Sequence, residues 1–254
     1  MTRTDSLKGR TALVTGAARR IGREIALALA EAGVNIVAHY RRSTDQAEKL
    51  RKELAARGTK VWLIAADFEN AAETQRLFST VLHLAGSVDI LVNSASIFLP
   101  DTIRDMDLTG LMRSIQVNAW APFTLSREFA RNVDYGKIIN LLDSRIVGFD
   151  RSHAAYSLSK RTFAAMTEMM AVEFAPDITV NGVAPGLILP PAGKDQGYLE
   201  DLVATVPLKR HGSASDITDA VLYLLRSDFV TGQVVFVDGG RHLMERYSGP
   251  NHHQ

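Results

Sequence analysis

Short apolar runs alternate with amphipathic segments along most of the chain. The runs that we predict to be strands are Thr11–Thr15, Val34–His39, Lys60–Ala65, Asp89–Asn93, Lys137–Leu142, Thr179–Val183 and Val234–Val237. Strands this uniformly apolar are typical of a parallel sheet that is buried on both faces. Between them, apolar residues recur at helical spacing, as in Ile21, Ile25 and Leu29. The alternation predicts an α/β fold: a single-domain, Rossmann-type, doubly wound parallel sheet of about seven strands, flanked by helices on both faces.

The chain has 254 residues, which suits one large domain over residues 1–254 better than two small ones. No Pro/Gly/Ser-rich linker and no internal repeat divides it. The longest irregular stretch runs from Pro185 to Pro207, and stretches of that length in compact domains are usually binding loops. We therefore expect a substrate loop at about 187–207 and a flexible tail at about 248–254.

Composition narrows the functional classes. The formal charge of +1 gives no basis for attraction to nucleic acid or to a membrane surface. The chain has no cysteine for disulfides, thiolate metal sites or a nucleophile, and its seven histidines lack metal-ligand spacing, so we expect no metal. Residues 1–10 do not look like a signal peptide, and no apolar stretch is long enough to span a bilayer. These features predict a soluble, cytoplasmic protein.

A glycine turn follows the first predicted strand and opens the first predicted helix. It reads Thr15-Gly16-Ala17-Ala18-Arg19-Arg20-Ile21-Gly22. Gly16 allows a tight turn, and the helix start offers free N–H groups and a positive dipole to a pyrophosphate. The pattern favours a dinucleotide site that includes Gly16, Arg19, Arg20 and Ile21. The alternative is an ordinary strand-to-helix turn.

The segment after the second predicted strand indicates which dinucleotide binds. An NAD site normally has an Asp or Glu there, which accepts hydrogen bonds from the ribose hydroxyls. This chain instead has two guanidinium groups and a hydroxyl, which suit a 2′-phosphate, in the run His39-Tyr40-Arg41-Arg42-Ser43. We therefore expect NADPH as the cofactor, with contacts from Tyr40, Arg41, Arg42 and Ser43. The alternative is a solvated basic turn.

Tyr156 and Lys160 are four residues apart in a segment that is predicted to be helical, so their side chains share one face. An ammonium beside a phenol favours the phenolate. We therefore expect the pKa of Tyr156 to fall from ~10 toward the working range of an acid/base catalyst. His153 lies one turn before Tyr156, and we expect it to be exposed.

Taken in order, these motifs resemble those of the short-chain dehydrogenase/reductase family over almost the whole chain. They are the turn at Gly16, Asp67 after the third strand, Asn93-Ser94-Ala95-Ser96 after the fourth, Asn118, Tyr156 with Lys160, and Pro185-Gly186. The resemblance implies a cofactor site in which Asp67 and Phe68 hold the adenine. It further implies ribose and phosphate contacts from Asn93, Ala95 and Ser96, nicotinamide contacts from Pro185, Gly186 and Ile188, and a water relay that Asn118 positions behind Lys160.

Three departures from the common pattern are similar to the pteridine reductase branch of that family, which includes bacterial dihydromonapterin reductases. Arg20 replaces a glycine, Ser94-Ala95-Ser96 replaces Asn-Ala-Gly, and Asp143 replaces a serine thirteen residues before the tyrosine. An ionised carboxylate would repel a ketone oxygen, whereas it accepts hydrogen bonds from the N–H and NH₂ groups of a pterin. The alternative for Asp143 is a helix-capping or loop carboxylate.

Phe98 lies where that branch has a phenylalanine, and the resemblance implies that the pterin stacks against it; the alternative is a buried core residue. Arg20 is expected to reach over the pyrophosphate toward the substrate, or else to be a solvated charge at the helix start. The implied substrate contacts are Arg20, Ser96, Phe98, Asp143 and Tyr156. The implied catalytic residues are Asp143, Tyr156, Lys160 and Asn118. Tyr156 and Lys160 also belong to the implied cofactor site, where Lys160 would hold the nicotinamide ribose.

Together these residues predict NADPH-dependent reduction of a dihydropterin, either dihydrobiopterin or dihydromonapterin, with dihydrofolate as a further candidate. A hydride would pass to a C=N carbon, and Tyr156 with Asp143 would deliver the proton. One alternative is a general NADPH-dependent carbonyl or 3-oxoacyl reductase of the same family. A second is a non-catalytic NADP(H)-binding regulator.

An apolar stripe follows Lys160 along its predicted helix, formed by Met166, Met169, Met170 and Phe174. A stripe of this kind is usually core or subunit contact. The family resemblance implies that this helix packs in a subunit interface. We therefore expect a homo-oligomer, specifically a tetramer.

Overall fold

The computed structural model describes residues 6–148, 150–191 and 193–246, and one seven-stranded parallel sheet forms its centre. In spatial order the strands are β3 (Val61–Ala65), β2 (Asn35–Tyr40), β1 (Thr11–Val14), β4 (Ile90–Asn93), β5 (Gly136–Leu141), β6 (Ile178–Pro185) and β7 (Val234–Val237). All seven predicted strands are confirmed, with ends that differ by one or two residues at most. The order reverses between β1 and β4, which is where doubly wound sheets bind their ligands.

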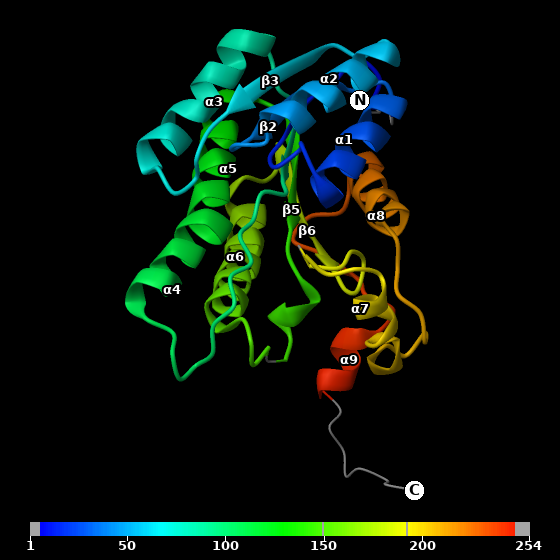
Figure 1. Cartoon of the computed structure of the whole chain (residues 1–254). Helices are drawn as coiled ribbons and strands as arrows, with labels where there is room; N and C mark the ends of the chain where they lie inside the picture. Colours follow the sequence, from blue (N-terminus) through cyan, green and yellow to red (C-terminus); the bar gives the residue numbers. More distant parts are fainter. Residues whose placement is uncertain (1–5, 149, 192, 247–254) are drawn as a thin grey trace, which may run out of the picture.

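Helices cover both faces of the sheet, as Figure 1 shows. One face carries α1 (Arg20–Glu31), α2 (Thr44–Ala56) and α8 (Ala214–Arg226), and the other carries α3 (Ala71–Ala85), α5 (Ala121–Asn132) and α6 (Ala154–Glu173). Successive strand residues serve the two faces in turn: Ala12 and Val14 pack with the first group and Leu13 with the second. The shorter helices are α4 (Leu108–Ile115), α7 (Gly197–Glu200) and α9 (Arg241–Arg246). No described helix is both long and apolar enough to cross a membrane.

Burial differs between the centre and the edges of the sheet. Every residue of β1, β4 and β5 is buried. The edge strand β7 is only half-buried, and so is most of β3. The expected burial on both faces therefore holds for the central strands and is wrong for the edges, because an edge strand has a neighbour on one side only.

The stretch from residue 185 to residue 207 is more regular than its composition suggests. Pro185 is the last residue of β6, and the stretch contains α7 and a 3₁₀ turn at Val203–Thr205. Leu187, Leu199 and Val206 form a small apolar cluster of their own. The described residues of the predicted loop thus include regular helical turns and pack on one another, so the loop is not irregular throughout. The predicted tail at 248–254 lies outside the described residues.

Between α4 and α5 the chain makes a π-helical turn, Gln116–Trp120. Such turns are rare and are frequent at functional sites. Asn118 lies at the middle of this turn and is buried. The π-helical turn determines where Asn118 points. The apolar periodicity of the sequence does not predict this turn.

Candidate active site at the carboxyl edge of the sheet

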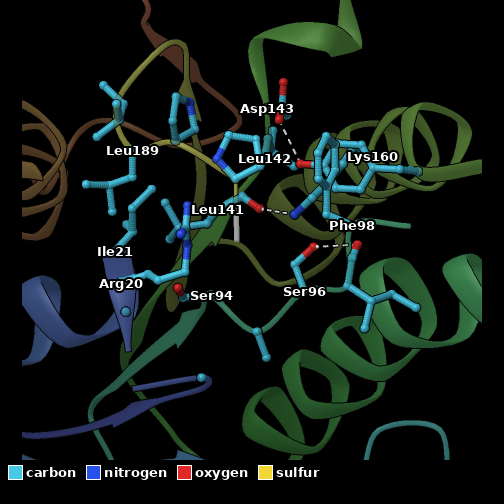
Figure 2. Close-up of a pocket in the computed structure, with 18 of the residues that line it drawn as sticks. Arg20, Ile21, Ser94, Ser96, Phe98, Leu141, Leu142, Asp143, Lys160 and Leu189 are labelled. Atoms are coloured by element: carbon cyan, nitrogen blue, oxygen red, sulfur yellow. Dashed lines mark hydrogen bonds between the residues drawn. The ribbon is translucent and has the colours of Figure 1, made fainter. Parts of the chain in front are cut away.

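A cavity of about 900 Å³ opens at the carboxyl ends of the strands, where residues from distant motifs meet (Figure 2). The predicted site residues that line it are Gly16, Arg19, Arg20, Ile21, Arg41, Asp67, Phe68, Ala95, Ser96, Phe98, Asp143, Tyr156, Lys160, Pro185, Gly186 and Ile188. The other predicted residues do not belong to its lining: Tyr40, Arg42, Ser43, Asn93 and Asn118.

The turn after β1 is held close to the end of β4. Gly16 has a φ angle of 66°, and a Cβ atom there would lie 3.0 Å from the Cα of Ala95. The hydroxyl of Thr15 accepts hydrogen bonds from the backbone N–H groups of Ser94 (2.9 Å) and Ala95 (3.0 Å). Position 16 therefore requires glycine both for its backbone conformation and for this close approach.

His39, at the end of β2, fixes the same turn from the other side. The buried ring accepts a hydrogen bond at Nδ1 from the backbone N–H of Gly16 (3.2 Å). Its Nε2 lies 3.1 Å from the carbonyl oxygen of Ala66, and the ring stacks on Phe68 at 4.5 Å between centroids. Burial lowers the pKa of His39 to about 4, so the imidazole is neutral at pH 7. We did not single out this residue from the sequence, and only its place at a strand end could have marked it.

Two carboxylates approach the arginines that we expect to hold a 2′-phosphate. Nη1 of Arg41 lies 2.8 Å from Oε1 of Glu69 and 3.7 Å from Oδ1 of Asp67. Nη2 of Arg42 lies 3.6 Å from Oδ2 of Asp67, and its side chain remains 79% exposed. Glu69 also accepts a hydrogen bond of 2.8 Å from Arg113, which lowers the pKa of Glu69 below its ordinary value. The basic segment itself has no carboxylate, but the fold brings these two from the end of β3.

Arg20 links the glycine turn to the predicted substrate loop. Its Nη2 donates a hydrogen bond of 2.8 Å to the carbonyl oxygen of Pro190. Its φ angle is 56°, a conformation that favours glycine and costs another residue ~1–2 kcal/mol. The side chain is exposed and lines the cavity, so it is more than a solvated charge at the helix start. Its contact with a pyrophosphate stays a prediction.

The phosphate end of the cavity fits an anionic cofactor. α1 begins at Arg20 without a side-chain cap from Arg19, and its first turn holds no acidic residue. The first N–H groups of the helix are therefore available to a phosphate. Arg19, Arg20 and Arg41 add positive charge to the same lining.

Asp143, after β5, contacts Tyr156 of α6. The tyrosine hydroxyl donates a hydrogen bond of 2.7 Å to Oδ2 of Asp143 (Figure 2). The other oxygen, Oδ1, accepts a hydrogen bond of 2.8 Å from the backbone N–H of Arg145 and caps the 3₁₀ turn Ser144–Ile146. The capping contact and the tyrosine contact coexist because each uses a different oxygen of the carboxylate.

Lys160 lies one turn beyond Tyr156 in α6 and is buried. Its Nζ donates to the carbonyl oxygen of Leu141 (2.7 Å) and lies 5.8 Å from the centroid of the tyrosine ring. Burial lowers the pKa of Lys160 to about 8. Burial and the adjacent Asp143 raise the pKa of Tyr156 well above its ordinary value. The expected fall in the tyrosine pKa is therefore wrong, because burial, together with a carboxylate at hydrogen-bond distance, outweighs a more distant ammonium.

The side chain of Asn118 joins the end of β4 to α6. Its oxygen accepts hydrogen bonds from the backbone N–H of Ile97 (2.8 Å) and the hydroxyl of Ser96 (3.0 Å). Its nitrogen donates to the carbonyl oxygen of Ile97 and to the hydroxyl of Ser159, both at 3.0 Å. These contacts use the full hydrogen-bonding capacity of the amide. Asn118 thus holds the cavity wall in place, and its part in a water relay stays a prediction.

Known proteins with similar sequences are reductases. A family model described as enoyl-(acyl carrier protein) reductase matches residues 16–242. The chain belongs to the short-chain dehydrogenase/reductase family. It is 34% identical over 252 residues to 3-oxoacyl-(acyl-carrier-protein) reductase FabG of Staphylococcus epidermidis, with 92% of this chain and 99% of that protein covered. It is also 34% identical to a short-chain type dehydrogenase/reductase of Picea abies, with 92% and 93% covered.

Solved structures similar to this chain include proteins in complex with NADP or NADPH. FolM alternative dihydrofolate reductase 1 from Brucella canis, solved with NADP, superposes with a TM-score of 0.89 at 29% identity and covers 95% of this chain and 97% of its own. A blue fluorescent protein from a metagenomic library, solved with NADPH, gives 0.86 at 32% identity, with 93% and 99% covered. The comparisons therefore support an NADP-dependent reductase of this family, in agreement with the expected cofactor.

In this member of the family, Phe98 and His153 form part of the cavity wall. The two rings stack at 3.8 Å between centroids, and Tyr156 meets Phe98 edge-on at 4.7 Å. Both line the cavity, and His153 is only half-buried. The expected exposed position of His153 is wrong. The spacing of three residues to Tyr156, which puts both on adjacent positions of one helix face, could have revealed it.

Arg145 and Asp150 are functional candidates that we did not identify from the sequence. Nε of Arg145 lies 2.8 Å from Oδ2 of Asp150, and Nδ1 of His153 lies 3.1 Å from the same oxygen. Asp150 is three residues before His153, but no spacing in the sequence connects Arg145 to either. These contacts form because residues 144–153 fold back on themselves between β5 and α6.

Proposed function

We propose that the protein reduces dihydropterins to their tetrahydro forms with NADPH. Dihydrobiopterin and dihydromonapterin are the first candidates, and dihydrofolate has the same ring system. The observation that carries the proposal is the 2.7 Å hydrogen bond between Tyr156 and Asp143 at the cavity wall. A carboxylate at a position where this family usually has a serine suits a substrate that presents N–H and NH₂ donors.

NADPH, when bound, supplies a hydride. Gly16 and the first turn of α1 would hold its pyrophosphate, and Arg41 and Arg42 its 2′-phosphate. The remaining contacts follow the family pattern: Asp67 and Phe68 at the adenine, Asn93, Ala95 and Ser96 at the ribose and phosphates, and Pro185, Gly186 and Ile188 at the nicotinamide. The glycine turn, the uncapped helix start and the basic lining support this assignment.

Tyr156 and Asp143 would supply the proton that balances the hydride. Because the pKa of Tyr156 is raised, its hydroxyl remains protonated until the substrate nitrogen becomes basic during reduction. Asp143 would meanwhile accept hydrogen bonds from the substrate and orient its ring. Lys160, with a pKa of about 8, is an ammonium at neutral pH and would stabilise the phenolate that forms.

Phe98 supports a flat substrate in this place. It lines the cavity beside Tyr156, and one of its faces is covered by the His153 ring. A heteroaromatic ring that stacked on Phe98 would gain ~0.5–1.5 kcal/mol beyond simple burial. Arg20 and Ser96 complete the substrate contacts that we propose.

A 3-oxoacyl or general carbonyl reductase is the second candidate, favoured by the 34% identity to FabG. Asp143 counts against it, because an ionised carboxylate would face the ketone oxygen. A non-catalytic NADP(H)-binding regulator is less consistent with the site. Burying Asp143, Tyr156 and Lys160 together costs stability that a binding protein would have no reason to lose.

A steady-state panel tests the proposal. Dihydrobiopterin, dihydromonapterin, dihydrofolate and an acetoacetyl thioester are each offered with NADPH and with NADH. We expect turnover of at least one dihydropterin with NADPH, at a higher kcat/KM than the thioester. Turnover of the thioester alone would favour the carbonyl reductase, and NADPH binding without any turnover would favour the regulator.

We also propose that the protein is a homo-oligomer, specifically a tetramer. The predicted apolar stripe divides between two faces: Met170 is buried, whereas Met169 is exposed. Further large apolar side chains are exposed on α4, the π-helical turn and α6, three elements that pack against one another: Leu108, Met112, Trp120 and Val172. Exposed apolar groups of this size support a subunit contact. Light scattering at micromolar concentration should give a multiple of the 27.8 kDa chain mass, and a monomer would reject the proposal.

A further inference from the structure

Arg145 contacts both oxygens of the Asp143 carboxylate. Its backbone N–H donates to Oδ1 at 2.8 Å, and its Nη1 lies 3.7 Å from Oδ2. Oδ2 is also the oxygen that accepts the hydrogen bond from Tyr156. The backbone contact therefore fixes one oxygen and leaves the other between a phenol and a guanidinium.

The guanidinium is itself held in place. Its Nε lies 2.8 Å from Oδ2 of Asp150, and the two side chains are only 19% and 13% exposed. The other oxygen of Asp150 accepts a hydrogen bond of 2.8 Å from the backbone N–H of Ser152, and His153 contacts Oδ2. Both oxygens of Asp150 are thus engaged, so it can fix Arg145 without turning toward the cavity.

The ring of Phe98 also packs against the Arg145 guanidinium. The central carbon of the Arg145 guanidinium lies 5.1 Å from the centroid of the Phe98 ring, within the range of a cation–π contact. Lys160, the other buried cation near this site, donates to the carbonyl of Leu141 rather than to Asp143. Arg145 therefore lies beside the carboxylate, whereas Lys160 contacts the Leu141 carbonyl and lies 5.8 Å from the centroid of the Tyr156 ring.

We propose that Arg145 is a positioning residue that holds the Asp143 carboxylate directed at Tyr156, so that the tyrosine can pass its proton to the substrate. This inference rests on the proposed role of Asp143. Burial and Asp143 raise the pKa of Tyr156, so the proton of the pair belongs to the phenol, while the guanidinium 3.7 Å from Oδ2 attracts the carboxylate. The titratable and charged groups around the pair are Lys160 from α6, Arg145 from the 3₁₀ turn, Asp150 and His153 from the following loop, Tyr198 from α7, and Lys194 and Arg241 in the cavity lining.

A purely structural reading of Arg145 makes a different prediction. The contact with Asp150 could simply fasten the loop between β5 and α6. In that case a substitution would lower stability but leave the pH dependence of turnover unchanged. The pH profile, rather than the size of the activity loss, therefore separates the two readings.

The test compares Arg145→Gln, Arg145→Lys and Arg151→Gln with the parent enzyme. Arg151 is an exposed arginine of the same loop that does not line the cavity, so it controls for loss of one positive charge. The kcat for the dihydropterin is measured from pH 5 to pH 9 at saturating NADPH. We expect Arg145→Gln to move the acid limb of the profile to higher pH, because the cation beside the carboxylate is gone. Arg145→Lys should recover most of the shift, and Arg151→Gln should show none.

Four outcomes would overturn the proposal. One is an acid limb that is absent from the parent enzyme or unchanged in Arg145→Gln. A second is an increase in KM with kcat and the limb unchanged, which would make Arg145 a direct substrate contact. A third is an equal shift in Arg151→Gln, and a fourth is loss of the limb in His153→Gln, which would assign it to the imidazole.

Failure of the proposed function would look different. If the acetoacetyl thioester alone is turned over, the pterin assignment fails, and the same four profiles can be measured with that substrate. If Asp143→Asn retains full turnover of the dihydropterin, Asp143 has no proton role, and this inference falls while the proposed dihydropterin reduction stands. If dihydropterin turnover depends on Asp143 and the Arg145 variants keep the parent pH profile, this inference alone is wrong.

Discussion

The two ends of the cavity are built in different ways. The proposed cofactor end has a backbone turn at Gly16 and partly exposed arginines. At the substrate end, Asp143, Tyr156 and Arg145 are largely buried, and each is held by another side chain. Exposed ion pairs contribute little to stability, whereas buried charged groups are costly to disturb. We therefore expect changes at the substrate end to alter the chemistry, and changes at the cofactor end to alter affinity.

The largest expected effect comes from removing the phenol. Tyr156→Phe deletes the proton donor, so we expect kcat to fall by ~10²–10⁴-fold. NADPH affinity, measured by fluorescence titration, should change little. Tyr223→Phe, an exposed tyrosine on α8, serves as the control and should keep parent activity. A Tyr156→Phe variant with near-parent kcat would contradict the expectation that changes at the substrate end alter the chemistry.

Lys160 tests how strongly burial acts at the substrate end. Its pKa of about 8 lies below the unfolded value of about 10.4, so the folded protein loses this proton first as pH rises. The free energy of unfolding should therefore rise between pH 8 and pH 9.5, by about 2 kcal/mol for this group, and the gain is lost as pH falls back through 8. Above pH 10 the raised pKa of Tyr156 acts in the opposite direction. Urea unfolding of the parent and of Lys160→Met measures the slope, which should disappear in the variant.

Gly16→Ala tests the cofactor end through its backbone. The new Cβ would need the left-handed conformation and would lie 3.0 Å from the Cα of Ala95, so we expect about tenfold weaker NADPH binding. Gly9→Ala is the matched control, because Gly9 also has a positive φ but no atom within 4 Å of its Cβ position. Gly9→Ala should lose stability and keep its NADPH affinity. Equal loss of affinity in both would mean that backbone strain alone, not the site, is responsible.

The smallest expected effects are at the exposed arginines. Arg42→Ala should weaken NADPH binding several-fold and leave NADH binding unchanged, because only NADPH carries the 2′-phosphate. Glu69→Gln should act in the opposite direction, since it releases Arg41 from a competing carboxylate at 2.8 Å; the expected gain is ~1.5–5-fold. Fluorescence titrations with both cofactors measure these changes. Weaker NADPH binding by Glu69→Gln would show that Glu69 supports the site rather than competing for Arg41.

The same contrast explains what the sequence could predict. The strands, the order of motifs and the glycine turn follow from periodicity and from residues adjacent in the chain. The Asp143–Tyr156 register is also local, since thirteen residues separate a strand end from the first turn of a helix. The glycine turn and the basic segment were therefore predictable, whereas the approach of Glu69 and Asp67 to the arginines was not.

The remaining contacts depend on how segments pack. The π-helical turn that carries Asn118, and the Arg145–Asp150 pair, have no periodic signal. The predicted fall in the pKa of Tyr156 was wrong. Helix spacing identifies Lys160 as a neighbour of Tyr156, but it gives neither the distance between them nor the burial of the phenol beside Asp143, which raises the pKa. Side-chain contacts across a loop decide such questions, and they appear only in the folded chain.

The most direct test of the central claim compares kcat/KM of the parent and of Asp143→Ser for a dihydropterin and for an acetoacetyl thioester. The variant restores the residue usual in the family, so it should still fold and bind NADPH. We predict a loss of about 100-fold or more with the dihydropterin and an equal or higher value with the thioester. Undiminished turnover of the dihydropterin by Asp143→Ser would contradict the account.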